Sequence, residues 1–309
     1  MNPFSIAIHG GAGTILPSSM TPDKEAAYRA MLEKSVVAGH GILALGGSAI
    51  DAVQVAVEIM EDSPLFNAGK GSVYTHQGLH EMDASMMDGN GLRVGSVAGV
   101  RKIANPIKLS RLIMEQSQHV FLIGEGAEAF ARVHNMDWVE PEYFATDYRY
   151  AQLLQIQGSE LTQLDHSEDA LKKYGTVGAV ALDMKGNLAA ATSTGGLTNK
   201  RYGRIGDSAI IGAGTYAENG VCAVSCTGWG EFFIRGMAAY EVAALMKYKE
   251  MSIVEASNYV IDEKIARMGG DGGMIAVDSK GIIHLPFNTP GMYRAAIQES
   301  GKMEISIYG

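Results

Sequence analysis

Apolar residues along this chain fall into two patterns, a helical spacing in some segments and short continuous runs in others. We expect a helix from Thr21-Pro22 to about Leu45, because proline is favoured at the first helical position and Gly46-Gly47 supplies a stop. Ser48 is a good N-cap for a second helix over 49–62, which is apolar on one side at helical spacing.

The continuous apolar runs predict strands, and two pairs of runs predict hairpins. The first hairpin is expected over 175–196, where Lys-Gly-Asn joins two β-prone runs, and the second over 272–289. A strand beginning at about Phe4 is expected to end in the glycines of 10–13, which allow a tight left-handed turn. Further strands are expected at 79–89, 91–100, 208–217 and 220–228, further helices at 108–117, 231–249 and 252–268, and a strand followed by a helix at 120–131.

Helices therefore cluster early and late, with strand-rich stretches on both sides of residue 175. This order predicts an α/β protein in which helices pack on both faces of mostly antiparallel sheets. A Rossmann fold needs regular βαβ alternation, which the hairpins contradict.

The composition changes abruptly in the middle of the chain. Residues from about 155 to 174 are polar and charged, which indicates a solvated linker or a helix surface. A run rich in apolar residues begins again at Gly175-Thr176. This boundary is the most unusual local feature of the sequence.

Overall charge and hydrophobicity exclude some classes of partner. The chain has 309 residues, a formal net charge of −9 and no basic run, so we expect neither nucleic acid nor an anionic membrane surface as a partner. No window approaches the ~18 apolar residues of a spanning helix, and the N-terminus lacks the features of a secretory signal. We therefore expect a soluble cytoplasmic protein.

The cysteines and histidines do not indicate a metal or redox site. Cys222 and Cys226 share one face of an expected strand but lie roughly 13 Å apart along it, too far for a disulfide, so we expect buried reduced thiols. His76 and His80 are four residues apart, but Gly78 spoils the helix that a metal pair needs, and surface histidines are expected. The HGGAG segment after the first strand lacks the third glycine of a dinucleotide-binding loop.

A threonine at the composition boundary suggests a chemistry. Cleavage between Gly175 and Thr176 would leave a threonine amine at the tip of a strand, and a glycine before it permits the strained backbone that an intramolecular attack requires. The free α-amine has an ordinary pKa of ~7.7–8.0, so it can accept the proton of its own hydroxyl. Nearby hydroxyl residues at expected strand ends are Thr192, Ser193, Thr194, Thr198 and Thr227.

Several long segments resemble the plant-type L-asparaginases, also called isoaspartyl aminopeptidases. The matching segments are 6–13, 64–75, 82–89, 105–131, 175–196, 198–217, 223–235 and 285–295. The resemblance implies an N-terminal-nucleophile hydrolase with an αββα sandwich, which hydrolyses L-asparagine and β-aspartyl dipeptides through a β-aspartyl-enzyme ester and requires no cofactor.

The resemblance also implies the catalytic residues. Thr176 matches the self-processing nucleophile, and Thr194 matches a second threonine that contacts the nucleophile and its amine. Thr227 and Gly228 match an oxyanion hole and substrate contacts, and Asn67 matches a residue close to the nucleophile.

Substrate and ion contacts follow from the same resemblance. Arg204 and Asp207 match a pair that holds the α-carboxylate and α-amine of the substrate, although from the residues alone an exposed ion pair is the plainer interpretation. Gly230 matches a further substrate contact, and no role is assigned to Trp229. A sodium-binding loop is implied, with ligands from the backbone carbonyls of Met60, Glu61, Ser63, Phe66, Ala68 and Lys70.

The resemblance implies a division of the chain into two subunits. Residues 1–175 would form the first, ending in a mobile polar tail at about 155–175, and residues 176–309 the second, with both completing one structural domain. Two such units would pair as (αβ)2. The alternatives are a glycosylasparaginase-like or a taspase-like hydrolase of the same fold, or a non-catalytic ligand-binding relative.

Overall fold

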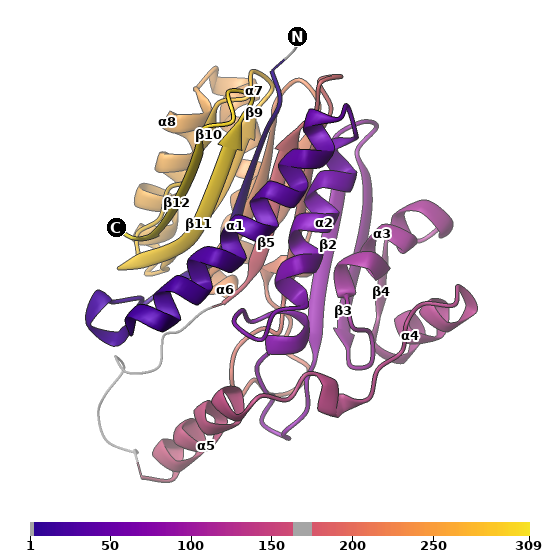
Figure 1. Cartoon of the computed structure of the whole chain (residues 1–309), viewed down its shortest axis with the longest axis vertical. Coiled ribbons are helices and arrows are strands. Elements are labelled where there is room, and N and C mark those ends of the chain that lie inside the picture. Colours follow the sequence, from indigo (N-terminus) through magenta and orange to yellow (C-terminus); the bar gives the residue numbers. More distant parts are fainter. Residues whose placement is uncertain (1–2, 163–174) are drawn as a thin grey trace.

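Two β-sheets form the centre of the computed structural model, which describes residues 3–162 and 175–309 (Figure 1). The eight-stranded sheet has the order β12-β11-β1-β5-β6-β2-β3-β4, and the four-stranded sheet has the order β10-β9-β8-β7. The strands of the larger sheet are β1 (Ser5–Gly13), β2 (Met82–Asp88), β3 (Arg93–Val100), β4 (Phe121–Ile123), β5 (Val177–Leu182), β6 (Leu188–Thr194), β11 (Gly291–Gln298) and β12 (Met303–Tyr308). Those of the smaller sheet are β7 (Thr215–Glu218), β8 (Cys222–Gly228), β9 (Gly272–Asp278) and β10 (Ile283–His284).

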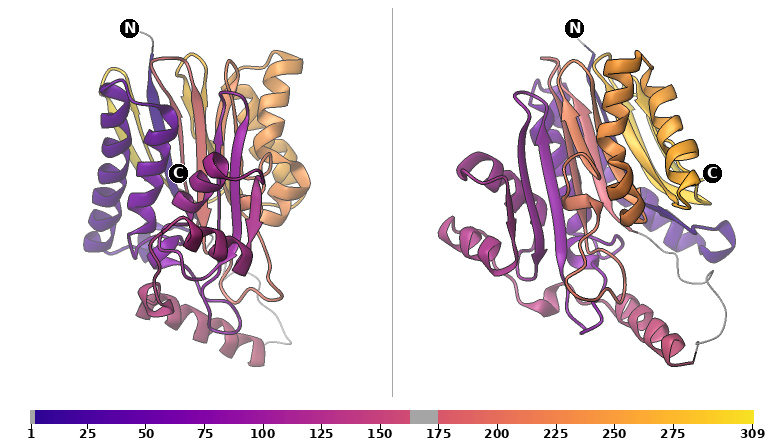
Figure 2. Two further views of the ribbon diagram at one scale, coloured as in Figure 1. Left: turned by 90° about the vertical axis from the view of Figure 1, so that its right-hand side faces the viewer. Right: turned by 180° about the vertical axis from the view of Figure 1, so that it is seen from behind.

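Helices cover the outer faces of the two sheets (Figures 1 and 2). On the larger sheet lie α1 (Pro22–Ala44), α2 (Ala49–Glu61) and α3 (Pro106–Gln116), and on the smaller sheet lie α7 (Ala238–Lys249) and α8 (Ile253–Asn258), which continues into a π-helical segment, Tyr259–Ile265. The remaining helices are α4 (Gly124–Val133), α5 (Asp147–Thr162) and α6 (Gly230–Gly236), with short 3-10 turns at Pro17–Ser19, Gly69–Gly71, Pro141–Tyr143 and Asp207–Ala209. The protein is therefore of the mixed α/β class, as the sequence predicted.

The central strands are buried on both faces, which explains why they read as continuous apolar runs. Along β5, Val177 and Ala179 belong to the core beneath α1 and α2, whereas Val180 and Leu182 belong to the core that includes the smaller sheet. Residues at the start of β5 are thus enclosed between two packed layers.

Several predicted elements are confirmed together with their ends. The Thr21 hydroxyl accepts a hydrogen bond from the Lys24 amide at 3.3 Å and begins α1, and the Ser48 hydroxyl accepts from the Asp51 amide at 3.2 Å and begins α2. Both predicted hairpins form, as β5–β6 and β9–β10. Among the strand pairs described, β3–β4 is parallel and the others are antiparallel, so a Rossmann arrangement is ruled out.

Other predictions about the elements were wrong. The glycines of 10–13 do not form the expected tight turn, because β1 continues through them to Gly13 with a bulge after His9. The segment 208–217 is mostly irregular, and the helix expected over 231–249 breaks at Met237, which has a left-handed φ of 46°.

One region of the chain was not predicted, and another lies largely outside the described residues. The C-terminal strands β11 and β12 were not predicted, although β11 pairs with β1. The polar stretch begins inside α5, and most of the predicted mobile tail, residues 163–174, lies outside the described residues.

Both cysteines are buried free thiols in β8, as expected. The prediction of two surface histidines fails for His80, which is buried and lies 3.1 Å from the Ser72 hydroxyl through Nδ1. Burial lowers the pKa of His80 to about 4. Within residues 3–162 and 175–309, no helix has the length and apolarity needed to cross a bilayer.

Candidate active site

Gly175 and Thr176 lie at the entrance of β5, in the middle of the larger sheet. Thr176 is buried, with 6% of its surface exposed. Gly175 packs closely against the loop that carries Asn67, since a Cβ atom on Gly175 would lie 2.7 Å from the Cβ of Asn67.

The carbonyl group between Gly175 and Thr176 accepts two hydrogen bonds. The Thr194 hydroxyl donates to the Gly175 oxygen at 3.0 Å, and the Asn67 side-chain amide donates to the same oxygen at 2.8 Å. The Thr176 hydroxyl in turn donates to Thr194 Oγ1 at 3.2 Å. A carbonyl that receives two donors is polarised, and negative charge developing on its oxygen is stabilised.

Backbone contacts fix the two donor side chains. Asn67 Oδ1 accepts from the Val73 amide at 2.9 Å, so its Nδ2 must face the Gly175 carbonyl and the Gly196 carbonyl, 2.7 Å away. Thr194 Oγ1 accepts from the Gly196 amide at 3.0 Å. Both donors are therefore oriented before any reaction begins, which is the condition for effective electrostatic stabilisation.

A buried chain of hydrogen bonds supports Thr176 from the side of the smaller sheet. His9 Nδ1 lies 3.1 Å from the Thr176 carbonyl oxygen, which can only accept, so Nδ1 carries the proton. His9 Nε2 then accepts from the Ser225 hydroxyl at 3.0 Å, and burial lowers the pKa of His9 to about 3, so the ring is neutral. Behind Ser225 the chain continues through Thr192, Thr215 and Ser85 at distances of 2.7, 2.6 and 2.7 Å.

Charged groups lie on the opposite side of the Gly175–Thr176 bond. A narrow cavity is lined by Gly175, Thr176, Thr194, Gly196, Leu197, Arg204, Gly206, Asp207, Ser208 and Gly228. Arg204 does not pair with Asp207 as an exposed ion pair. Its guanidinium instead donates twice to the Glu231 carboxylate, at 2.9 and 2.7 Å.

Asp207 is buried with one carboxylate oxygen, Oδ2, lacking a hydrogen-bond partner among the described residues. Burial raises the pKa of Asp207 to about 7, even though the Arg204 charge acts in the opposite direction. Gly230 lets the backbone pass close to both charged side chains, because a Cβ atom there would lie 2.7 Å from Asp207 Oδ1 and 3.0 Å from Arg204 Nη2. A buried carboxylate with a free oxygen is suited to an incoming ammonium group.

The structure brings most of the predicted residues to this cavity, but not all of them line it. Gly228 lines it with a φ of 149°, where a Cβ atom would lie 2.5 Å from the Asp271 carbonyl oxygen. Thr227 is buried at the end of β8, and its hydroxyl accepts from the Ala12 amide at 3.2 Å. Asn67 borders a second cavity, on the other side of Gly175.

The last turn of α2 and the loop that follows it contain the carbonyl groups expected to bind sodium. A Cβ atom on Gly69 would lie 2.4 Å from the Glu61 carbonyl oxygen, and one on Gly71 would lie 2.1 Å from the Phe66 carbonyl oxygen. The two glycines therefore let the loop fold back over these oxygens. Among the described residues there is no group of three or more His, Cys, Asp or Glu side chains that could hold a metal ion.

Sequence reasoning missed two contributors to the site. Glu231 lies inside the matched segment 223–235, but nothing local joins it to an arginine 27 positions earlier. His9 was treated as part of a turn, and its contact with Thr176 spans 167 positions. The available signal for His9 was its position inside an apolar run, where a polar side chain needs a hydrogen-bond partner.

Comparison with known proteins agrees with the resemblance seen in the motifs. A family model described as asparaginase matches residues 1–307. An isoaspartyl peptidase of Escherichia coli is 55% identical over 293 residues, covering 94% of this chain and 91% of that protein. A probable isoaspartyl peptidase/L-asparaginase of Arabidopsis thaliana is 40% identical over the whole of both chains, and an isoaspartyl peptidase/L-asparaginase of Mus musculus is 41% identical over 98% of this chain and 90% of that protein. The chain belongs to this asparaginase family.

Proposed function

We propose that this chain is the precursor of an amidohydrolase that cuts itself between Gly175 and Thr176 and then hydrolyses L-asparagine and β-aspartyl dipeptides. The observation that carries the proposal is the pair of donors, Thr194 and Asn67, on the carbonyl oxygen of the bond to be cut. The names of the similar proteins support the substrate class.

Self-cleavage begins when Thr176 Oγ1 attacks the Gly175 carbonyl carbon. The hydrogen bonds provide a route for its proton, because Thr176 donates to Thr194 and Thr194 donates to the Gly175 oxygen. The tetrahedral intermediate collapses by breaking the C–N bond, the nitrogen takes up a proton, and an ester remains. Water hydrolyses that ester, which yields a Gly175 carboxylate and a free Thr176 amine and hydroxyl.

The mature site uses Thr176 again, now with its own amine as the base. Arg204 binds the substrate α-carboxylate and Asp207 its α-ammonium, with Gly230 making room beside them. Thr176 then attacks the side-chain carbonyl, and Thr227 and Gly228 stabilise the oxyanion. Each such donor contributes about 2.7–4 kcal/mol in comparable enzymes. The leaving amine departs with a proton, and water resolves the β-aspartyl ester.

The layered arrangement fits an αββα sandwich of the N-terminal-nucleophile type. In the mature enzyme residues 1–175 and 176–309 stay associated, because β5 and β6 lie between β1 and β2 in one sheet. Two such units pair as (αβ)2, and the enzyme works in the cytoplasm without a required cofactor.

A structural sodium ion would be held by the last turn of α2 and the loop that follows it. The carbonyl groups of Met60, Glu61, Ser63, Phe66, Ala68 and Lys70 are its proposed ligands, and the approach of Gly69 and Gly71 to the Glu61 and Phe66 oxygens fits this role. An ion there would hold the loop that carries Asn67.

The competing functions differ in substrate or in chemistry. A taspase-like endopeptidase is disfavoured by the buried Asp207 beside Arg204, since residues within a protein chain have no free α-ammonium to bind. A glycosylasparaginase-like enzyme is disfavoured by Gly-Thr at the junction, where Asp-Thr would be expected. A non-catalytic relative is disfavoured because Thr176, Thr194 and Thr227 are all present.

The first test is intact-mass and N-terminal analysis after incubation at neutral pH, followed by assays with L-asparagine and a β-aspartyl dipeptide. We expect two fragments whose masses sum to the chain plus one water, with the second beginning Thr-Val-Gly-Ala, and hydrolysis of both substrates. A persistent 32.9 kDa chain that hydrolyses neither substrate contradicts the proposal.

A further inference from the structure

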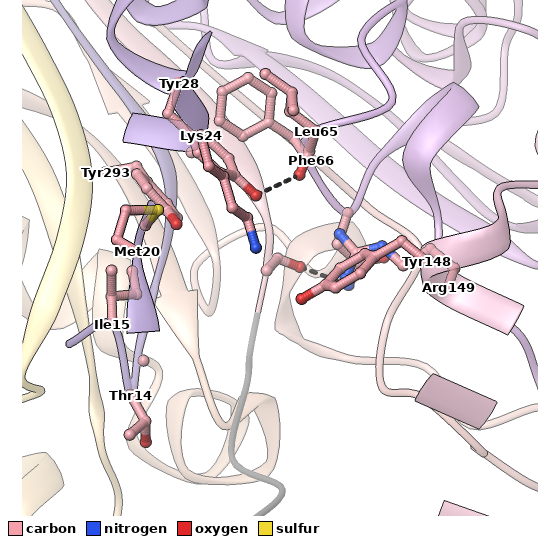
Figure 3. A pocket seen from close by; sticks show the side chains of 14 residues that line it. Thr14, Ile15, Met20, Lys24, Tyr28, Leu65, Phe66, Tyr148, Arg149 and Tyr293 are labelled. Atoms are coloured by element: carbon pink, nitrogen blue, oxygen red, sulfur yellow. Dashed lines mark hydrogen bonds between the residues drawn. The ribbon is translucent and has the colours of Figure 1, made fainter. Parts of the chain in front are cut away.

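Gly175 also borders a second cavity, whose lining does not include Arg204 or Asp207 (Figure 3). Its free space, counting the part open to solvent, is about 600 Å³. Its walls include Lys24, Tyr28, Phe66, Tyr148, Arg149 and Tyr293. Gly175 lines both this cavity and the one that holds Thr176, so it stands between them.

The cavity carries two cationic side chains without carboxylate partners among the described residues. Arg149 is 8% exposed, and its guanidinium donates to two neutral acceptors, the Gly71 carbonyl at 2.8 Å and Gln152 Oε1 at 3.0 Å. The Lys24 amine lies 4.9 Å from the centre of the Tyr148 ring. Figure 3 shows the Lys24 amine and the Tyr148 hydroxyl directed into the same space, with Arg149 beside them. A buried cation without a counter-charge is unfavourable, so this space favours an anion.

Apolar and aromatic side chains form the rest of the cavity. Tyr28 and Tyr293 stack with ring centres 4.2 Å apart, and Phe66 meets Tyr28 edge-on at 5.5 Å. The Tyr28 hydroxyl donates to the Leu65 carbonyl at 3.0 Å, which fixes this wall. Such a cavity matches a ligand with both an apolar side chain and a carboxylate.

A β-aspartyl dipeptide bound at the active site would extend its second amino acid toward the second cavity. Its α-groups are held at Arg204 and Asp207, its side-chain carbonyl is at Thr176, and its leaving amino acid must extend away from both. Once the bond to Thr176 is cut, Gly175 is free to leave the position that separates the two cavities. The leaving amino acid of a dipeptide carries a free carboxylate, whereas L-asparagine releases only ammonia.

We propose that this second cavity is the subsite for the leaving amino acid of a β-aspartyl dipeptide, and that Lys24 and Arg149 bind its carboxylate. The proposal rests on the proposed function and adds a substrate preference to it, for dipeptides with an apolar second residue and a free C-terminal carboxylate.

The test compares three substrates on the processed enzyme: β-aspartyl-leucine, its C-terminal amide and L-asparagine. The variant is Lys24→Gln, which keeps the cap of α1 because Thr21 accepts from the backbone amide of residue 24. The matched control is Lys34→Gln, a change of an exposed lysine on the same helix.

We expect the wild-type enzyme to have about tenfold higher kcat/KM for β-aspartyl-leucine than for its amide, mainly through KM, as loss of a charge-assisted hydrogen bond predicts. Lys24→Gln should reduce this difference, with Arg149 keeping part of it, and leave L-asparagine hydrolysis and self-cleavage within about twofold of wild type. Lys34→Gln should behave as wild type.

Equal rates for acid and amide on the wild-type enzyme overturn the subsite while leaving the proposed function intact. Equal rates are also expected if the cavity instead holds the carboxylate that cleavage creates on Gly175. Lys24 and Arg149 would then be paired with Gly175 and could not bind the carboxylate of the substrate. The subsite is also overturned if Lys24→Gln lowers kcat/KM for L-asparagine as much as it lowers kcat/KM for β-aspartyl-leucine. A processed wild-type enzyme that hydrolyses none of the three substrates refutes the proposed function, and the subsite with it.

Discussion

Replacing Thr194 with valine tests the cleavage mechanism most directly. Valine keeps the shape of the side chain but removes the hydroxyl that donates to the Gly175 oxygen at 3.0 Å and accepts from the Thr176 hydroxyl at 3.2 Å. The other donor, Asn67 Nδ2 at 2.8 Å, remains in place. The variant therefore removes one of two donors and the route of the proton together.

The expected loss follows from these contacts. Removing one donor of an oxyanion hole costs about 2.7–4 kcal/mol, which corresponds to a 10²–10³-fold slower reaction. The substitution also leaves the buried Gly196 amide without its acceptor, at a cost of about 1–3 kcal/mol in the free energy of unfolding. We therefore expect a folded precursor with a lower melting temperature that cleaves at least ~100-fold more slowly.

The assay is a time course of intact mass on freshly purified precursor, with a thermal melt to confirm cooperative unfolding. Thr194→Ser should keep most of the rate, since it retains the hydroxyl. Thr198→Val is the matched control, because Thr198 makes no hydrogen bond to Gly175 among the contacts described. A folded Thr194→Val protein that cleaves within threefold of wild type would refute the proposed role of this hydroxyl.

Three further predictions concern the same site. Glu231→Gln should lower KM for L-asparagine about two- to fivefold with little change in kcat, because the half-exposed carboxylate competes for the Arg204 fork; steady-state kinetics showing an unchanged or higher KM would contradict it. Because burial raises the pKa of Asp207 to about 7, its charged form is lost as pH falls below that value. The inhibition constant of L-aspartate should therefore rise about tenfold per pH unit below 7 and level off above it, and a flat profile between about pH 5.5 and 8 would count against an ionised Asp207 as the ammonium ligand. Gly175→Ala should slow self-cleavage at least about tenfold, since a Cβ atom 2.7 Å from that of Asn67 must displace the scissile carbonyl; mass spectrometry showing wild-type timing would rule this out.

Elements that depend on near neighbours could be predicted from the sequence. The starts of α1 and α2 follow from Thr21 and Ser48, whose hydroxyls accept from amides three residues ahead. The two hairpins follow from apolar runs joined by short turns. The change of composition at Gly175 also identified the start of a buried strand, because it depends only on local hydrophobicity.

Family resemblance predicted more of the site than the physical pattern of the residues did. From the residues alone, Arg204 and Asp207 read as an exposed ion pair, whereas Asp207 is buried and Arg204 pairs with Glu231. The need for glycine at 175 was anticipated, but the close approach of Asn67 was not, since it comes from a loop more than a hundred residues earlier.

The sequence by itself determined where two helices and two hairpins begin, which apolar runs are buried and which bond stands at the boundary of the apolar core. Only the tertiary structure decided which groups meet at that bond. The strand β1 pairs with β5 from the second half of the chain, and this places His9 against Thr176. Hydrogen bonds between residues so far apart carry no local sequence signal, because they form only when the packing of the whole chain has closed the intervening loops.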